Sequence, residues 1–184
     1  MANPAPGRLE LVQDFVNTLD LEDGKDDLDT PAKLWSWFAE RELLAPEDPI
    51  PSAAERATAL ELREGIRAIL YSNNTGVSDP VALECLDRCE DNLHIHLRVH
   101  LGRERPLVLE AEDGGVQGAL GKLLTIVFEA MLDGTWTNFK ACARSSCRWA
   151  FYDISKNHSG RWCRMATCGN REKVTSYRLR RSAS

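Results

Sequence analysis

The 184-residue sequence predicts an α+β protein. We expect a mainly helical N-terminal domain with one β-hairpin over residues 1–133, and a small C-terminal module of a hairpin and a helix over residues 134–184. Three observations predict this organisation. Apolar residues recur at helical spacing through most of the first domain, they alternate with polar residues only near residues 93–101, and four of the six cysteines lie in the C-terminal module.

Four helices are expected before the alternating segment, over residues 8–19, 30–44, 52–71 and 80–92. Two of them carry clear start signals. Thr30 precedes Pro31, the pattern of an N-cap followed by proline at the first helical position. Ser52 and Glu55 match a capping box, in which two side chains satisfy backbone N–H groups at the helix start. The acidic segment 20–29, between the first two helices, predicts a solvated loop.

The alternating segment predicts the β-hairpin. Apolar residues alternate with His94, His96, Arg98 and His100, which gives a strand with one apolar face, and residues 107–111 return as the second strand. A last helix of this domain follows, ended by Gly134. It has an apolar stripe of Val116, Ala119, Leu120, Leu123, Val127 and Met131.

The charge distribution supports two modules. Residues 1–133 hold 26 acidic and 12 basic side chains, a net charge of −14, whereas residues 134–184 hold 11 basic side chains against Asp153 and Glu172, a net of +9. A chain polarised in this way predicts modules with different partners, divided near residues 133 and 134.

Neither a secretory signal nor a membrane span is expected. The N-terminal segment lacks a basic stretch followed by an apolar one. The most apolar segment, Leu120 to Leu132, is about half the length of a span and carries Lys122 and Glu129. We therefore expect a cytoplasmic protein without a membrane partner, in which cysteines are metal ligands, catalytic groups or core residues rather than disulfides.

Two close cysteine pairs in the C-terminal module predict one structural zinc ion. Cys142, Cys147, Cys163 and Cys168 follow the pattern C-x4-C-x15-C-x4-C. Each pair can occupy two corners of a tetrahedron, and four thiolates leave no open position for a catalytic water. The alternatives are two disulfides or four buried free thiols. His158 is a further candidate ligand, which we interpret as a turn residue.

The chain between the pairs fits a small metal-bound module. Residues 148–154 predict a short strand and residues 155–160 a turn. Trp149, Phe151 and Trp162 are expected to form a small core beside the metal, because so short a segment buries little surface alone. Gly169 permits a close backbone approach or a positive φ after the last ligand.

The segment CARSSCRWAFYDISKNHSGRWCRMATCGNR resembles the CGNR zinc finger, which is named for its Cys-Gly-Asn-Arg ending, here residues 168–171. Residues 9–18, LELVQDFVNT, resemble the opening of the ABATE domain, which usually precedes that finger and is described as a putative stress-induced transcription regulator. The family usually carries an apolar residue where Gln13 stands here.

The resemblance implies a zinc-binding, DNA-associated regulator with the four cysteines as ligands. It implies no fixed role for the Asn-Arg pair. Asn170 is expected to bond to backbone near the cysteine turn, and Arg171 either to pair with Asp153 or to contact phosphate.

The basic charge of the C-terminal module predicts a nucleic-acid surface. Residues 171–181 read as a helix, and the module keeps a charge of about +7 once four thiolates bind Zn²⁺. The candidate phosphate contacts are Arg144, Arg148, Arg161, Arg164, Arg171, Lys173, Arg178, Arg180 and Arg181. DNA is the expected form of nucleic acid.

A protein partner is the alternative. The basic module would then dock on an acidic partner, on a component of the transcription machinery such as polymerase or a sigma factor, or on its own acidic domain, which could mask it until a signal arrives. The N-terminal domain is expected either to sense that signal or to mediate homo-oligomerisation. The signal could be a small-molecule effector bound near Trp35, Trp37 and Phe38. The same aromatic residues also suit a core.

We do not expect an enzyme, because the sequence contains no Gly-rich phosphate loop, Gly-x-Ser-x-Gly or His-Glu-x-x-His motif. Cys85 and Cys89 precede the three histidines of segment 94–100 and suggest a second metal site. The alternation puts these histidines on a polar strand face, and the cysteines suit a helical core, which favours structural roles.

Overall fold

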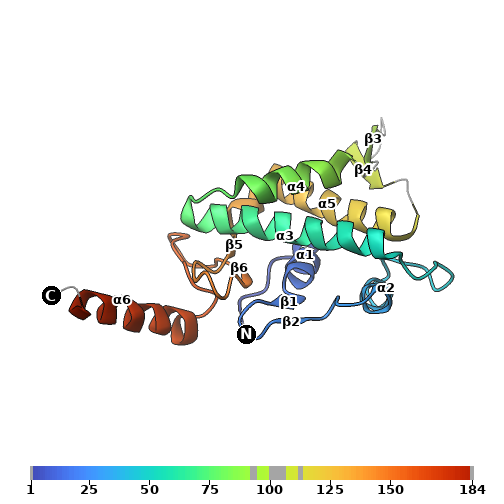
Figure 1. Cartoon of the computed structure of the whole chain (residues 1–184). Coiled ribbons are helices and arrows are strands. Elements are labelled where there is room, and N and C mark those ends of the chain that lie inside the picture. Colours follow the sequence, from blue (N-terminus) through green and yellow to red (C-terminus); the bar gives the residue numbers. More distant parts are fainter. Residues whose placement is uncertain (1, 92–94, 100–106, 112–113, 183–184) are drawn as a thin grey trace.

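A computed structural model describes residues 2–91, 95–99, 107–111 and 114–182, and it confirms the α+β class (Figure 1). The helices of residues 1–133 are α1 (Leu9–Val16), α2 (Pro31–Ala39), α3 (Ala53–Thr75), α4 (Pro80–Asp91) and α5 (Gly115–Asp133). Their strands are β1 (Leu19–Asp20), β2 (Lys25–Asp26), β3 (Ile95–Val99) and β4 (Leu107–Ala111). The C-terminal module contains the 3-10 helix η1 (Thr135–Asn138), β5 (Phe139–Ala141), β6 (Ala150–Tyr152), the π-helical turn η2 (Met165–Gly169) and α6 (Asn170–Ser182).

The central helix α3 starts at the predicted capping box. Ser52 Oγ accepts from Glu55 N at 3.1 Å, and Glu55 Oε2 accepts from Ser52 N at 2.7 Å. The helix runs past the expected end at residue 71 and stops where Gly76 takes a φ of +73°. This extra turn places the end of α3 against the C-terminal module, and α3 also contacts α1, α2, α4 and α5 (Figure 1).

The second helix is shorter than predicted. The Thr30 side chain caps α2 by accepting from Lys33 N, as expected. The helix ends at Ala39 instead of residue 44, because the chain turns at Glu42, with a φ of +57°, and Leu43 N bonds back to Phe38 O at 2.9 Å. Leu43 and Leu44 are nevertheless buried. The apolar pattern therefore predicted the burial of this segment correctly, and the length of the helix wrongly.

The segment 20–29 is not a simple solvated loop. It contains the antiparallel pair β1–β2, with Leu19 opposite Asp26, and Gly24 takes a φ of +66° in the turn. Asp26 accepts from both ends of the Arg63 guanidinium group, at 2.7 and 2.9 Å. A buried arginine of α3 therefore anchors this small hairpin.

The one β-hairpin that the sequence predicts for residues 1–133 is confirmed. β3 and β4 pair in antiparallel register, with Ile95 opposite Ala111 and Val99 opposite Leu107. The side chains of Cys85, Cys89 and His96 and the whole of His94 and His100 lie outside the described residues, so a second metal site stays untested.

The last helix of the N-terminal part, α5, is a core helix. It is long and apolar enough to cross a membrane, but 56% of its most apolar window is buried inside the molecule, as in a core helix of a globular protein. The predicted stripe is buried except for Met131, which is 48% exposed. Gly134 ends the helix with a φ of +81°, as predicted.

The hydrophobic core continues across residues 133 and 134. Phe15, Phe38, Leu62 and Leu120 are fully buried, and Trp136, Phe139, Ala141 and Ala150 of the C-terminal module join the same cluster. The rings of Trp37 and Phe38 pack against Phe15, with centroids 5.6 and 6.1 Å from that of Phe15. Of the three aromatic residues suggested for an effector pocket, these two are therefore core residues.

Candidate metal centre

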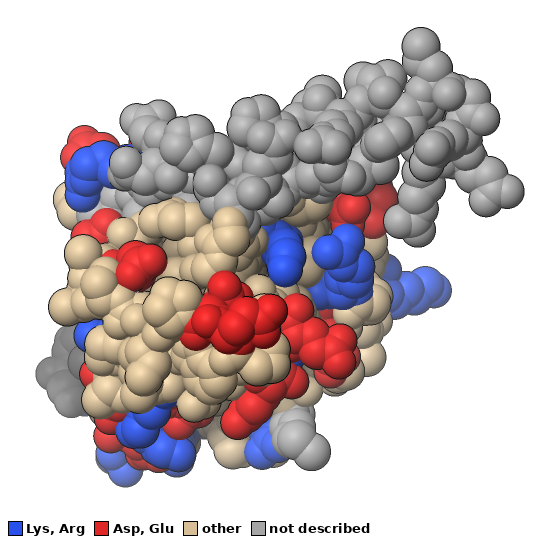
Figure 2. Space-filling view, turned by 90° about the vertical axis from the view of Figure 1, so that its right-hand side faces the viewer, with Lys and Arg blue, Asp and Glu red and all other residues tan. Residues whose placement is uncertain are grey.

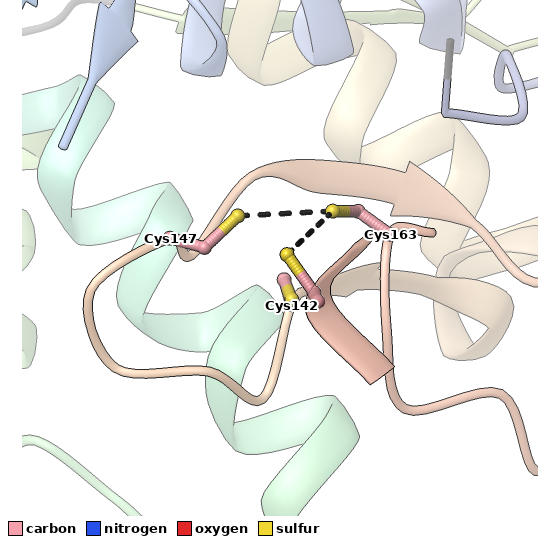
Figure 3. Close-up of side chains that lie close together, drawn as sticks. Cys142, Cys147 and Cys163 are labelled. Carbon is pink, nitrogen blue, oxygen red and sulfur yellow. Dashed lines mark hydrogen bonds between the residues drawn. The ribbon is translucent and has the colours of Figure 1, made fainter. Parts of the chain in front are cut away.

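The C-terminal module brings its four cysteines together. Cys142 follows β5, Cys147 precedes β6, and Cys163 and Cys168 lie before and within η2. All four Sγ atoms lie within 4.8 Å of one another, and Cys147–Cys163 and Cys163–Cys168 are each separated by 3.7 Å. Figure 3 shows the labelled side chains of Cys142, Cys147 and Cys163 pointing toward a common centre.

These distances fit one tetrahedral zinc ion. Zn–S bonds of about 2.3 Å in a tetrahedron place the sulfur atoms about 3.8 Å apart. A disulfide would hold two of them about 2.05 Å apart, and all four cysteines are free thiols. The residues therefore suit a single structural zinc and exclude the two-disulfide alternative for this arrangement.

Each thiol in the cluster shifts the pKa of its neighbours. Hydrogen bonds from Cys147 and Cys163 lower the pKa of Cys142 to about 2, whereas hydrogen bonding to Cys142 raises the pKa of Cys147 to about 12 and that of Cys163 as well. The cluster can hold a thiolate only beside sulfur atoms that keep their protons. A divalent cation replaces those protons and lets all four sulfur atoms bind as thiolates.

Local backbone geometry shapes the two cysteine turns. Cys147 N bonds to Arg144 O at 2.9 Å, and Arg148 then takes a φ of +45°. Cys142 N bonds to Trp149 O at 2.9 Å across the turn. In the second turn a Cβ at Gly169 would collide with the Met165 sulfur and lie 3.0 Å from Trp162 Cδ1. Gly169 thus permits a close approach of these side chains, one of the two roles expected for it.

The aromatic residues divide into two groups. Trp149 and Trp162 pack against the cysteines as predicted. Phe151 is buried but is not part of the cluster around the cysteines. His158 is a turn residue with a φ of +46°, and its Nδ1 lies 3.2 Å from Asp153 O.

A buried ion pair beside the metal centre was missed from the sequence. Lys140 Nζ lies 2.7 Å from Asp153 Oδ2, and it also donates to His158 O at 2.6 Å. Burial raises the pKa of Asp153, but hydrogen bonds from Lys140, Ser155 and Gly160 outweigh it and lower this pKa to about 2. The pair ties β5 and β6 to the turn at residues 155–160.

The expected pairing of Arg171 with Asp153 is wrong. Lys140 occupies that carboxylate, and Arg171 instead donates to Glu22 in the β1–β2 turn. Asn170 behaves as expected, because its Nδ2 donates to Ala166 O at 3.2 Å within the cysteine turn.

Amide side chains within and directly after α1 hold the C-terminal module. Asn17 Nδ2 donates to Ala150 O at 3.0 Å, and Asn17 Oδ1 accepts from Ala150 N at 2.7 Å. Gln13 is buried and donates to the same carbonyl at 3.1 Å, while its Oε1 accepts from Ala5 N at 2.6 Å. Gln13, where the resembling family carries an apolar residue, therefore joins β6 to the N-terminal segment, because its Nε2 also donates to Asn3 O at 3.0 Å.

The C-terminal half of α3 makes a second set of contacts with the C-terminal module. Asn74 Nδ2 donates to Ala141 O at 2.7 Å and to Arg161 O at 2.9 Å, which joins the chain at both cysteine pairs. Arg67 is 1% exposed and donates to Arg148 O at 3.2 Å. No spacing rule in the sequence signals these contacts, because each joins positions far apart in the chain.

The predicted phosphate contacts do not form one cluster. Arg144 and Arg171 meet at Glu22, whereas the Arg148 guanidinium lies 4.5 Å from the centre of the Tyr71 ring and is half-buried. Arg161 and Arg164 are exposed around the metal centre. The remaining candidates, all exposed, lie on α6: Lys173, Arg178, Arg180 and Arg181.

The fold and site define a class: a mainly helical domain fused to a four-cysteine zinc finger. Residues 9–133 match the ABATE family, described as "putative stress-induced transcription regulator", and residues 138–181 match the CGNR zinc finger. The chain belongs to the ABATE family and carries this zinc finger at its C-terminal end. Neither description is that of an enzyme. No curated protein shows significant similarity to the chain.

Proposed function

We propose that the protein is a transcription regulator that binds nucleic acid, with DNA as the form expected, through the basic surface of its zinc finger. The observation that carries this proposal is α6. This 13-residue helix extends away from the body of the molecule, and every residue of it whose burial is described is at least partly exposed (Figure 1). A helix that buries none of its described residues gains little from tertiary packing, so a partner outside the chain would give it a role.

The chemistry of α6 favours a phosphate-bearing partner. Lys173, Val174, Tyr177, Arg178 and Arg181 line one shallow face, and the Arg181 guanidinium lies 5.9 Å from the centre of the Tyr177 ring. Arginine side chains contact phosphate oxygens, and an aromatic ring beside them can stack on a base. The opposite end of the molecule carries a group of acidic side chains near the middle of its face, with basic side chains beside and below them, so this end is less favourable for a phosphate-bearing partner than α6 (Figure 2).

The zinc ion is structural in this proposal. It fixes the turn from which α6 starts, because Cys168 lies in η2 directly before Asn170. Zinc therefore supports binding without contacting the partner. A cytoplasmic location fits a protein that acts on the transcription machinery, and a stress signal, as in the family description, is the signal we propose for this chain.

A protein partner is a second candidate, favoured by the apolar part of α6. Val174 and Tyr177 are 49% and 56% exposed, and such residues among arginines are typical of a docking helix. The N-terminal part would then sense a signal or mediate oligomerisation. Trp35, the remaining residue of the suggested effector pocket, lines a hollow of about 520 Å³ with Leu43 and Lys122.

A salt series with matched variants tests the proposal. Zinc-loaded protein is titrated into labelled duplex DNA and single-stranded RNA, and anisotropy is followed. We expect Arg178→Ala with Arg181→Ala to weaken binding at least tenfold and to flatten the salt slope by about 1 to 2. The control, Lys25→Ala with Lys33→Ala, removes two exposed charges from the acidic part and should change little. Equal loss in both variants would contradict a specific role for α6.

A further inference from the structure

One carboxylate of the N-terminal part holds two arginines of the zinc finger. Glu22 Oε1 accepts from Arg144 Nη1 at 3.0 Å and from Arg171 Nη1. Arg144 lies between Cys142 and Cys147, and Arg171 lies in the first turn of α6. Guanidinium groups from both halves of the finger therefore converge on a single anionic oxygen.

The position of Glu22 is set by the fold. Its backbone N–H donates to Asp20 Oδ1 at 2.8 Å, which closes the β1–β2 turn. The buried Arg63 anchors this hairpin through Asp26. The carboxylate is thus presented to the finger by a built turn rather than by a flexible tail.

The contact is accessible enough to be exchanged. The side chains of Arg144, Glu22 and Arg171 are 22%, 37% and 54% exposed. Ion pairs with this exposure contribute only about 0–1 kcal/mol, because water screens them. A phosphate oxygen offers the same negative charge and hydrogen-bonding capacity to two guanidinium groups, with a geometry that arginine favours.

From this convergence, and resting on the proposed function, we infer that Arg144 and Arg171 form a phosphate-binding pair that Glu22 occupies in the free protein. Nucleic acid binds by displacing the Glu22 carboxylate with a backbone phosphate. Glu22 therefore acts as a built-in competitor that lowers the affinity of the finger, and a change that moves the β1–β2 turn would raise it.

The position of this pair also fixes where nucleic acid lies. Arg171 is at the base of α6, and the exposed Arg164 and Arg171 border a hollow of about 700 Å³ that reaches from the metal centre to Glu22. A strand that contacts α6 along its length meets the pair where the helix joins the finger. The phosphate at this point would be the one closest to the acidic part of the molecule.

The test is a double-mutant comparison in the full-length, zinc-loaded protein, with duplex DNA as the probe. Glu22→Gln keeps the shape and removes the charge, and we expect it to tighten binding about three- to tenfold at low salt. Asp23→Asn is the matched control, because Asp23 stands in the same turn, is exposed and carries the same charge. It should change affinity less than about twofold, since general repulsion is screened.

The arginine background separates displacement from general electrostatics. In a variant that already carries Arg144→Ala and Arg171→Ala, the further substitution Glu22→Gln should no longer tighten DNA binding. The two arginines that Glu22 would otherwise release for phosphate are absent from this variant. Zinc content and thermal unfolding check that each variant is folded. Equal gains from Glu22→Gln and Asp23→Asn, or a gain that persists without the arginines, would overturn the inference alone. No binding by any variant at low salt would overturn the proposed function as well.

Discussion

The Lys140–Asp153 pair illustrates how single polar residues stabilise the zinc finger. Both side chains are buried, and Asp153 also accepts from Gly160 N at 2.8 Å and Ser155 N at 3.0 Å. A buried carboxylate with this many donors stays ionised, and it fixes the turn that returns the chain to the second cysteine pair. The sequence shows an acidic residue in a basic module but not which of eleven cations will pair with it.

Replacing Asp153 should destabilise the protein in a pH-dependent way. The folded pKa of about 2 lies below the unfolded value of 3.8, so the pair contributes about 2 kcal/mol that is fully present above pH 4 and is lost as the pH falls toward 2. Asp153→Asn also leaves the Lys140 ammonium buried without a counter-charge, and we expect a total loss of about 3 kcal/mol at neutral pH.

Chemical unfolding of the zinc-loaded wild type and variant measures this loss. Both proteins are compared at each pH, so that loss of zinc in acid affects them alike. Asp27→Asn, at an exposed acidic residue, is the control and should cost less than about 0.5 kcal/mol. A stability difference between Asp153→Asn and the wild type that grows below pH 4 would contradict the assigned ion pair.

Some boundaries of the helices and strands are determined by residues adjacent in the sequence, and others by tertiary contacts. The start of α2 at Thr30, the capping box of α3 and the ends of α3 and α5 at Gly76 and Gly134 each depend on a few adjacent residues, and these starts and stops were predictable. The extent of α2 and the β1–β2 pair were not, because a backbone turn at Glu42 and a salt bridge from Arg63 decide them.

The turn η2 is the element on which the second cysteine pair depends. Gly169→Ala should weaken zinc binding about three- to tenfold, because a Cβ would crowd the Trp162 ring that packs against the cysteines, even if the exposed Met165 side chain moves aside. Competition with a chromogenic zinc chelator measures this affinity. Thr167→Ala, at an exposed position of the same turn, should bind zinc as the wild type does. Unchanged affinity in Gly169→Ala would show that η2 does not position the ligand.

At the scale of the whole molecule, the hydrophobic core continues across the boundary between the two modules that the sequence predicts. The four candidate zinc ligands could be predicted from the paired spacing together with the resemblance to the CGNR zinc finger, since the two members of each pair are only five residues apart. The docking of the module on α1 and α3 could not, because Gln13, Asn17 and Asn74 join segments that are distant in the chain. Charge alone suggested an acidic domain beside a basic one, and only the structure identified Glu22 as a residue that forms ion pairs with the basic one.

This arrangement makes the helical part and the zinc finger interdependent. Phe139, Ala141 and Ala150 bury their side chains in the core that α1, α3 and α5 share, while the metal fixes the outer half of the module. The zinc finger is therefore held at a fixed place on the helical part, and α6 extends from that place with its basic residues exposed.

The most direct test of this account is an equilibrium titration of labelled duplex DNA with the full-length protein across a salt series, before and after zinc removal by a chelator. We predict binding that weakens with salt at a slope of about −0.9 for each phosphate contact, that is lost without zinc and that returns when zinc is restored. Absence of binding at low salt by the zinc-loaded protein, or binding unaffected by zinc removal, would contradict the account.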